Sequence, residues 1–316
     1  MSEKQVIAVV GATGAQGRGL VRAILGDPAG GFRARALTRD PAGPRAQRLA
    51  AAGVEVMAAD LDDAPSLRRA FEGASAAFCV TFFWAHLSPD REIAQAARLA
   101  DAARDAGVPH VIWSTLEDTR RFVPLDDPRM PTLMGRFKVP HFDGKSEADR
   151  LFVDRGVPTT FLLTSFYWDN LIDFGMGPRV AADGTAEIAL PLGDARLPGM
   201  AADDIGACAY GIIKQRESFI GRTLGVAGGH LTGVEMAASL SRALGRPIRY
   251  RDVPLAEYRQ LPTPGAAELA NMFQFKREFQ EAFRSARRVD ESRALAPSLQ
   301  TFDTWLARNA HRIVVG

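Results

Sequence analysis

Val6-Ile7-Ala8-Val9-Val10-Gly11-Ala12-Thr13-Gly14-Ala15-Gln16-Gly17 is an apolar run that leads directly into a glycine-spaced turn. The apolar residues predict a buried strand, and the amphipathic residues 20–25 predict a helix after the turn. Gly11 is expected to make the turn, Gly14 to let a pyrophosphate lie against the main chain, and Gly17 to let the helix pack closely. The helix N-terminus would offer N–H groups and a positive dipole end to phosphate. The stretch therefore predicts a dinucleotide cradle.

The glycine spacing is G-x-x-G-x-x-G and differs from the G-x-G-x-x-G fingerprint. A glycine triplet alone occurs by chance in many chains, and the alternative reading is an ordinary strand-to-helix turn without a ligand. The preceding strand and the following helix favour the cradle.

The composition is that of a globular protein. Hydrophobic residues make up 47% of the 316 residues, charged residues 24%, and the net charge of +2 gives no broad field for nucleic acid. The chain has no apolar run of membrane-spanning length, and residues 1–5 lack a signal-peptide layout, so a cytoplasmic location is expected. Cys79 and Cys208 are expected to be buried thiols rather than a disulfide. The histidine spacing does not favour a metal site.

Strand and helix patterns alternate through the first half of the chain. The strands are expected at 5–10, 33–37, 54–58, 76–80, 110–113 and 159–163, and the helices at 15–26, 44–52, 64–72, 90–106 and 144–155. Gly53, Gly73, Gly107 and Gly156 stand where helices should end. This order predicts an α/β fold with a Rossmann-type doubly wound parallel sheet over residues 1–165.

The alternation weakens after residue 165. Residues 166–316 predict a smaller mixed α/β region over the cofactor crevice, interwoven with the first domain. Helices are expected at 203–215 and 233–244, a late strand at 224–227, and loops at 174–178 and 196–198. The proline-rich segment 117–139 is long for a connection and reads either as a lid or partner surface, or as an unrelated surface excursion.

The end of the second strand suggests which cofactor binds. A carboxylate there usually serves the adenosine ribose, whereas this chain places Arg39 there, and a guanidinium can grip a 2′-phosphate. NADP(H) is therefore favoured over NAD(H). The alternative is a solvated arginine opposite Asp40, with Asp40 serving the ribose. Asp60 and Leu61 end the third strand and could meet the adenine, or Asp60 could belong to a plain turn.

Aromatic residues follow the fourth strand. Thr81, Phe82 and Phe83 precede Trp84, and at this edge of the sheet they could wall the nicotinamide ribose. Aromatic side chains are also common core residues, so packing is the alternative.

Several motifs in the same order resemble the NmrA-like branch of atypical short-chain dehydrogenases. They are the glycine turn 11–17, Thr38-Arg39, Pro140-His141-Phe142-Asp143-Gly144-Lys145 and Phe166-Tyr167-Trp168-Asp169-Asn170. Leu269-Ala270-Asn271-Met272-Phe273 is similar to the redox-sensing members of that branch. The resemblance runs nearly end to end. It implies NADP(H) binding by residues 11–17, Arg39, Asp60, Lys145, Tyr167, Trp168, Asp169 and Asn170.

The chain departs from the family pattern at two positions. Ala94 stands where family members can present a lysine to the cofactor. Cofactor affinity is therefore expected to be lower, unless Arg91 or Arg98 replaces the lysine. Short-chain dehydrogenases use a tyrosine four residues before the lysine, and His141 occupies that position here. An imidazole could exchange a proton near neutral pH, although from a shorter side chain. Lys145 would keep a cofactor role. Ser114 stands where the superfamily's catalytic serine lies, or it simply bonds the backbone.

These features support three hypotheses about function. The absent tyrosine favours an NADP(H)-responsive regulator acting on a protein partner, with a homodimer possible. The alternative is an NADPH-dependent oxidoreductase of a quinone or other small carbonyl-like substrate, in which His141, Lys145 and Ser114 would act. A DNA-binding role rests only on the basic run 284–288, which reads as a solvated helix face, so nucleic acid and membrane partners are not expected.

Overall fold

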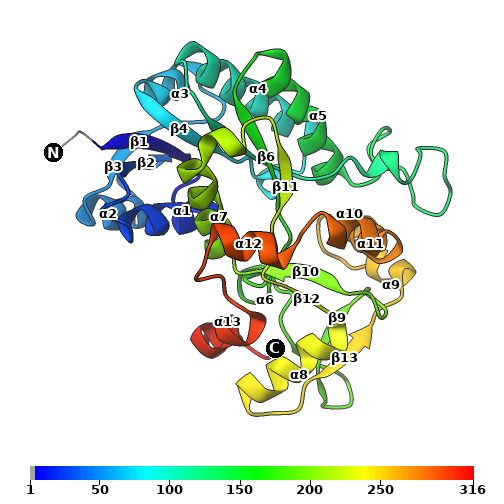
Figure 1. Cartoon of the computed structure of the whole chain (residues 1–316). Helices are drawn as coiled ribbons and strands as arrows, with labels where there is room; N and C mark the ends of the chain where they lie inside the picture. Colours follow the sequence, from blue (N-terminus) through cyan, green and yellow to red (C-terminus); the bar gives the residue numbers. More distant parts are fainter. Residues whose placement is uncertain (1–3) are drawn as a thin grey trace. The chain divides into compact units, whose positions relative to one another are not determined.

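The computed structural model describes residues 4–316 (Figure 1). Residues 1–3, part of the stretch examined for a signal peptide, lie outside the described residues. The chain forms two compact units, each made of separate stretches. The first unit contains the residues up to Asp118, His141–Thr164 and Asp203–Leu224, and the second contains Thr119–Pro140, Ser165–Ala202 and Gly225–Gly316.

A seven-stranded sheet forms the centre of the first unit, with the strand order β11-β6-β5-β4-β1-β2-β3. Strands β1 to β6 pair in parallel, and the order reverses on either side of β1. Ligands of such sheets bind beyond the carboxyl ends of the strands at this reversal. The predicted Rossmann-type fold is confirmed. The strands are β1 Gln5–Val10, β2 Phe32–Thr38, β3 Glu55–Ala58, β4 Ala74–Cys79, β5 Val111–Thr115, β6 Thr159–Leu163 and β11 Thr223–Gly225.

Helices cover both faces of this sheet (Figure 1). Apolar residues of α3, α4 and α5 share one buried cluster with the strands, while α1, α2 and α7 lie on the other face. The predicted terminal glycines after α2, α3, α4 and α5 all have positive φ. The helices are α1 Ala15–Leu25, α2 Pro44–Ala51, α3 Ala64–Phe71, α4 Pro89–Asp105, α5 Pro140–Asp154 and α7 Ala202–Lys214.

The contact between α1 and α7 requires glycine on both helices. A Cβ on Gly206 would lie closer than 3.0 Å to the backbone of Leu20, and a Cβ on Gly19 would come equally close to the backbone of Asp203. Arg18 reinforces the contact through a 3.0 Å ion pair with Asp203. Because of this close contact, α7 packs beside α1 on the same face of the sheet, although it comes much later in the sequence.

The second unit contains two small sheets, with strand orders β12-β10-β7 and β13-β9-β8. The strands are β7 Phe166–Tyr167, β8 Arg179–Val180, β9 Ala186–Leu190, β10 Leu197–Met200, β12 Gly229–Leu231 and β13 Arg249–Asp252. The helices are α6 Asn170–Asp173, α8 Gly233–Leu244, α9 Leu255–Arg259, α10 Ala266–Glu278, α11 Gln280–Ser285, α12 Val289–Leu295 and α13 Phe302–Asn309.

Two predictions for the later residues need correction. The loop expected at 196–198 is largely wrong, because Leu197 and Pro198 belong to β10, where pairing with β12 extends the backbone. The basic run 284–288 is a solvated face only in part, because Arg288 is exposed whereas the Arg287 guanidinium is fully buried 3.6 Å from the centre of the Phe283 ring. The predicted helices at 203–215 and 233–244 are confirmed to within one residue.

Segment 119–139 of the second unit is tied down by polar contacts. The buried Lys138 ammonium donates to the carbonyl of Met130 at 2.6 Å and to that of Asp127 at 2.9 Å. From α10, the Asn271 amide donates to the carbonyls of Lys138 at 2.7 Å and Pro131 at 2.9 Å. Asn271 belongs to the motif that resembles the redox-sensing members, and its contacts give that motif a structural role.

Cys79 and Cys208 are buried thiols that form no disulfide, as predicted, and burial raises the pKa of both. No helix between residues 4 and 316 combines the length and apolar character needed to cross a bilayer.

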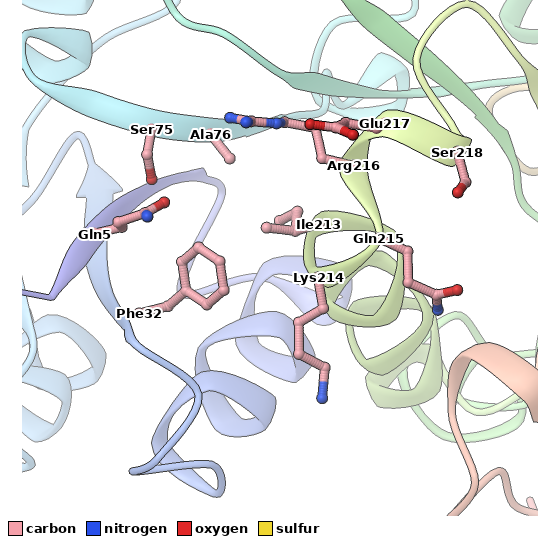
Figure 2. Close-up of a pocket in the computed structure, with 10 residues that line it drawn as sticks. All are labelled: Gln5, Phe32, Ser75, Ala76, Ile213, Lys214, Gln215, Arg216, Glu217 and Ser218. Atoms are coloured by element: carbon pink, nitrogen blue, oxygen red, sulfur yellow. The ribbon is translucent and has the colours of Figure 1, made fainter.

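A polar cavity of about 370 Å³ opens at the amino edge of the large sheet (Figure 2). Gln5, Phe32 and Ala76, near the starts of β1, β2 and β4, line one side, and residues 213–218, at the end of α7 and just after it, line the other. The glycine turn follows the opposite end of β1, so this cavity is not the expected dinucleotide cradle.

His110 near that amino edge makes stability depend on pH. Its Nε2 lies 2.8 Å from Thr160 Oγ1, and that hydroxyl donates to the carbonyl of Phe219, so Nε2 must be the donor. Its Nδ1 is buried without a partner among residues 4–316. Burial, assisted by the charge of Arg216, lowers the pKa of His110 to about 4. The folded state therefore prefers the neutral ring.

We expect His110 to cost stability as the pH falls. The neutral ring makes its full contribution to the free energy of unfolding above the unfolded pKa of about 6.5. Below that pH the unfolded state takes up a proton on His110 first, so this contribution is lost as the pH drops toward 4, a change of up to roughly 3 kcal/mol. In denaturant unfolding between pH 7 and pH 4, His110→Gln should show a shallower decline than wild type. The exposed His311→Gln serves as control. Equal slopes for wild type and His110→Gln would contradict this account.

Candidate functional site

The turn after β1 has the backbone geometry that the sequence predicts. Gly11 has φ of +64°, which favours glycine, and the Gly14 amide donates to its carbonyl at 2.8 Å. Gly14 then begins α1 with no side-chain cap, and the first helical turn carries no acidic residue. The N-terminus of α1 is therefore suited to an anion.

Gly17 is confirmed as a close-packing position. A Cβ there would lie closer than 3.0 Å to the carbonyl of Gly11 and to Cα of Ala12, and both are backbone atoms that cannot move aside. Helix α1 thus packs directly on its own turn, which fixes the direction of its N-terminus.

Arg39 follows β2 with an exposed side chain. No acidic side chain within residues 4–316 pairs with it, Asp40 included. The Asp40 amide donates to Thr38 Oγ1 at 3.3 Å, and the Asp40 carboxylate accepts from the amide of Ala42 at 3.2 Å. Asp40 therefore stabilises a local turn, and the Arg39 guanidinium can meet a ligand.

The residues after β3 form a second polar turn. Asp60 accepts from the Asp62 amide at 2.9 Å, and Leu61 packs against the core. Asp62 pairs with Arg91 at 2.6 Å and with Arg98 at 3.1 Å, and the Arg91 guanidinium holds the pKa of Asp62 below its usual value. The two arginines expected to compensate for Ala94 are therefore already paired with Asp62.

Lys145 on α5 lies in a buried polar network with Thr81 and Glu92. Its ammonium donates to the Thr81 hydroxyl at 2.8 Å and to the Thr81 carbonyl at 3.3 Å, and it lies 3.1 Å from Glu92 Oε1. The Thr81 hydroxyl donates to the same oxygen at 2.7 Å. Three acceptors surround an ammonium that has three protons.

His141 and Lys145 share α5, so Asp143 and Gly144 between them do not break the helix. His141 is only 7% exposed, and its ring centre lies 5.2 Å from that of Trp84 and 5.8 Å from that of Phe83. The Ser114 hydroxyl donates to Gln16 Oε1 at 2.9 Å, a side-chain contact where backbone bonding was the expected alternative.

The aromatic residues after β4 divide between packing and exposure. Phe83 is buried, so packing accounts for it, whereas Phe82 is 57% exposed. Thr81 is buried as well, and the contacts expected from Thr81, Phe82 and Phe83 to the nicotinamide ribose stay predictions.

Tyr167, Trp168, Asp169 and Asn170 belong to the second unit. Trp168 is buried against Phe302 and Trp305, and Asp169 accepts from the Ala202 amide at 2.8 Å. These contacts give Trp168 and Asp169 structural roles within their unit. The cofactor contacts that the resemblance implies for all four residues stay predictions.

Glu92 is the one member of the Lys145 network that the sequence did not reveal. An acidic residue in the first turn of a helix is common because it complements the helix dipole. The Ser88 cap of α4 strengthens this ordinary reading. Nothing in the local sequence separates Glu92 from an exposed acidic residue of this common kind. Its burial results from the packing of α4 against β4 and α5.

Gly17→Ala tests the geometry of the turn. The added methyl group must displace backbone, so we expect a loss of about 1 to 3 kcal/mol in unfolding free energy. Gly229→Ala is a matched control, because its Cβ would meet nothing closer than 4.0 Å. Equal stability of the two variants in denaturant unfolding would show that the turn tolerates a side chain.

The chain resembles both regulators and reductases. It is 32% identical over 259 residues to the NAD(P)H azoreductase of Xenophilus azovorans, covering 82% of this chain and 80% of that protein. It is 31% identical over 268 residues to the nitrogen metabolite repression protein nmrA of Emericella nidulans, covering 81% and 70%. Solved structures of NmrA, a negative transcriptional regulator, in complex with NADP and with NAD each align with a TM-score of 0.78 and 27% identity, covering 97% of this chain and 95% of theirs. Residues 3–306 match the model of the NmrA-like family, so the chain belongs to that family.

Proposed function

We propose that the chain binds NADP(H) at the turn after β1. The capless N-terminus of α1 would receive the pyrophosphate, and the glycine at position 11 supports the turn that leads to it. Arg39 would contact the 2′-phosphate, because its guanidinium is exposed and Asp40 is committed to a turn. The NmrA structures in complex with NADP and with NAD support a dinucleotide at this place.

Arg39→Ala should separate the two cofactors. A charge-assisted contact contributes about 1.5 to 3 kcal/mol, so calorimetry should show NADPH binding weakened by roughly ten- to a hundredfold, with NADH affinity unchanged. Arg48→Ala on α2 is the control, since it removes the same charge nearby. Equal losses for NADPH and NADH would show that Arg39 does not read the 2′-phosphate.

We infer further that the bound nucleotide regulates the protein. The observation that carries this inference is that the three candidate catalytic side chains are buried and engaged. The Lys145 ammonium faces Thr81 and Glu92, Ser114 donates to Gln16, and the His141 ring lies among aromatic rings. A dehydrogenase needs such groups aimed at a substrate. Relatives such as nmrA of Emericella nidulans carry names of repression proteins, in keeping with this role.

Regulation requires that the nucleotide bind two conformations of the protein with different affinity. The residues of the first unit would contribute the contacts: α1 to phosphate, Arg39 to the adenosine side, and Lys145, beside Thr81, to the nicotinamide ribose. A ribose hydroxyl would take the place of the Thr81 carbonyl, which at 3.3 Å is the most distant of the three acceptors around the Lys145 ammonium. The hydride chemistry of the cofactor when bound would be incidental to this function.

A reductase is the second candidate, and two observations favour it. One curated relative is an NAD(P)H azoreductase, and Phe82 presents an exposed aromatic ring after β4. An electron-poor acceptor such as a quinone or an azo compound accepts hydride with little help from a protein acid. The absent tyrosine is compatible with this chemistry.

NADPH oxidation across a panel of quinones and azo dyes distinguishes the candidates. For a regulator we expect no sustained turnover, while NADPH and NADP⁺ should change protease resistance or oligomer size to different extents. Sustained oxidation that Lys145→Met and His141→Ala abolish would instead establish the reductase. The exposed variant Lys214→Met provides the control for a lysine change away from the site.

A further inference from the structure

The Glu92 side chain is fully buried in the first unit, although a carboxylate is costly to remove from water. Its Oε1 accepts from the Thr81 hydroxyl and lies 3.1 Å from the Lys145 ammonium. Its Oε2 is buried and finds no hydrogen-bond partner in the described part of the chain. A carboxylate that served packing alone would be replaced at little cost by an apolar or amide side chain.

Lys145 is the positive group that Glu92 balances. The lysine side chain is 11% exposed and lies 5.1 Å from the centre of the Trp113 ring. The other charged side chains near Glu92 are engaged elsewhere, because Arg91 pairs with Asp62, and burial lowers the pKa of His86 and so favours its neutral form. The Lys145–Glu92 pair therefore has no net charge.

We propose that Glu92 sets the relative affinity of the protein for oxidised and reduced nucleotide. This assignment rests on the proposed function, in which Lys145 contacts the nicotinamide ribose. NADP⁺ and NADPH share every phosphate and ribose, and NADPH carries one additional hydride, which neutralises the positive charge of the nicotinamide ring. A change in their affinity ratio between variants that differ only in one charge therefore reports the local electrostatic potential. Lys145 alone would disfavour the oxidised ring, and the Glu92 carboxylate cancels that effect.

The expected size follows from Coulomb's law. Two unit charges about 8 Å apart, at an effective dielectric constant of about 20 to 40, interact with an energy that corresponds to roughly a five- to thirtyfold change in affinity. Contributions common to both nucleotides, including any general loss of stability, cancel in the ratio. A merely structural role for Glu92 would lower both affinities and leave the ratio unchanged.

Glu92→Gln is the direct test, because the amide keeps the shape of the side chain and removes its charge. The dissociation constants of NADPH and NADP⁺ would be measured by calorimetry at pH 7. We expect the ratio of the NADP⁺ constant to the NADPH constant to rise at least fivefold. Asp90→Asn, on the same turn of α4 but exposed, should leave the ratio within about twofold of wild type. A folded Glu92→Gln protein with an unchanged ratio would overturn the assignment.

The double variant and the Lys145 single variant complete a double-mutant cycle. In Glu92→Gln/Lys145→Met both side chains are neutral, so the ratio of the two dissociation constants should return to within about twofold of wild type. Lys145→Met leaves the Glu92 carboxylate unbalanced, so its ratio should fall. If Glu92→Gln does not fold, an unchanged or raised ratio in Lys145→Met overturns the assignment. Failure of wild type to bind either nucleotide would instead overturn the proposed function, and this assignment with it.

Discussion

The contact between Gly17 and the carbonyl of Gly11 is the constraint on which the candidate site depends. With no Cβ at position 17, α1 begins directly on the turn that ends β1. The direction of the helix is thereby fixed relative to the strand, and its N-terminal N–H groups point where an anion can reach them. A larger residue would move the helix, and every contact proposed for a pyrophosphate would move with it.

The same steric principle operates again on the other side of α1. Gly19 and Gly206 bring α1 and α7 into backbone contact, and Arg18 pairs with Asp203 beside them. Interior packing of this density leaves little freedom for either helix. The first unit thus holds the first half of α1 on two sides, against its own turn at Gly17 and, at Gly19, against a segment that lies far away in the sequence.

The buried polar groups of the first unit give the site its chemical character. The resemblance to short-chain dehydrogenases marks Lys145, Ser114 and His141 as candidate catalytic groups, yet each is directed to a partner inside the protein. A polar group in the interior is costly without a partner, so these contacts hold the three side chains in place. The Lys145–Glu92 ion pair has no net charge, which is compatible with the nucleotide binding that we propose.

The sequence by itself determined the parallel α/β order, the positive-φ turn at Gly11, the helix ends at glycine and the exposed arginine after β2. These features depend on local backbone preference and on periodicity within single elements. Only the tertiary structure decided that Phe83 packs while Phe82 is exposed, that Arg287 is buried, that Pro198 lies in a strand and that Glu92 meets Lys145. Thr81 and Lys145 are 64 residues apart, and their contact exists because β4, α4 and α5 pack together. No local pattern encodes a partner chosen by strand order and helix packing.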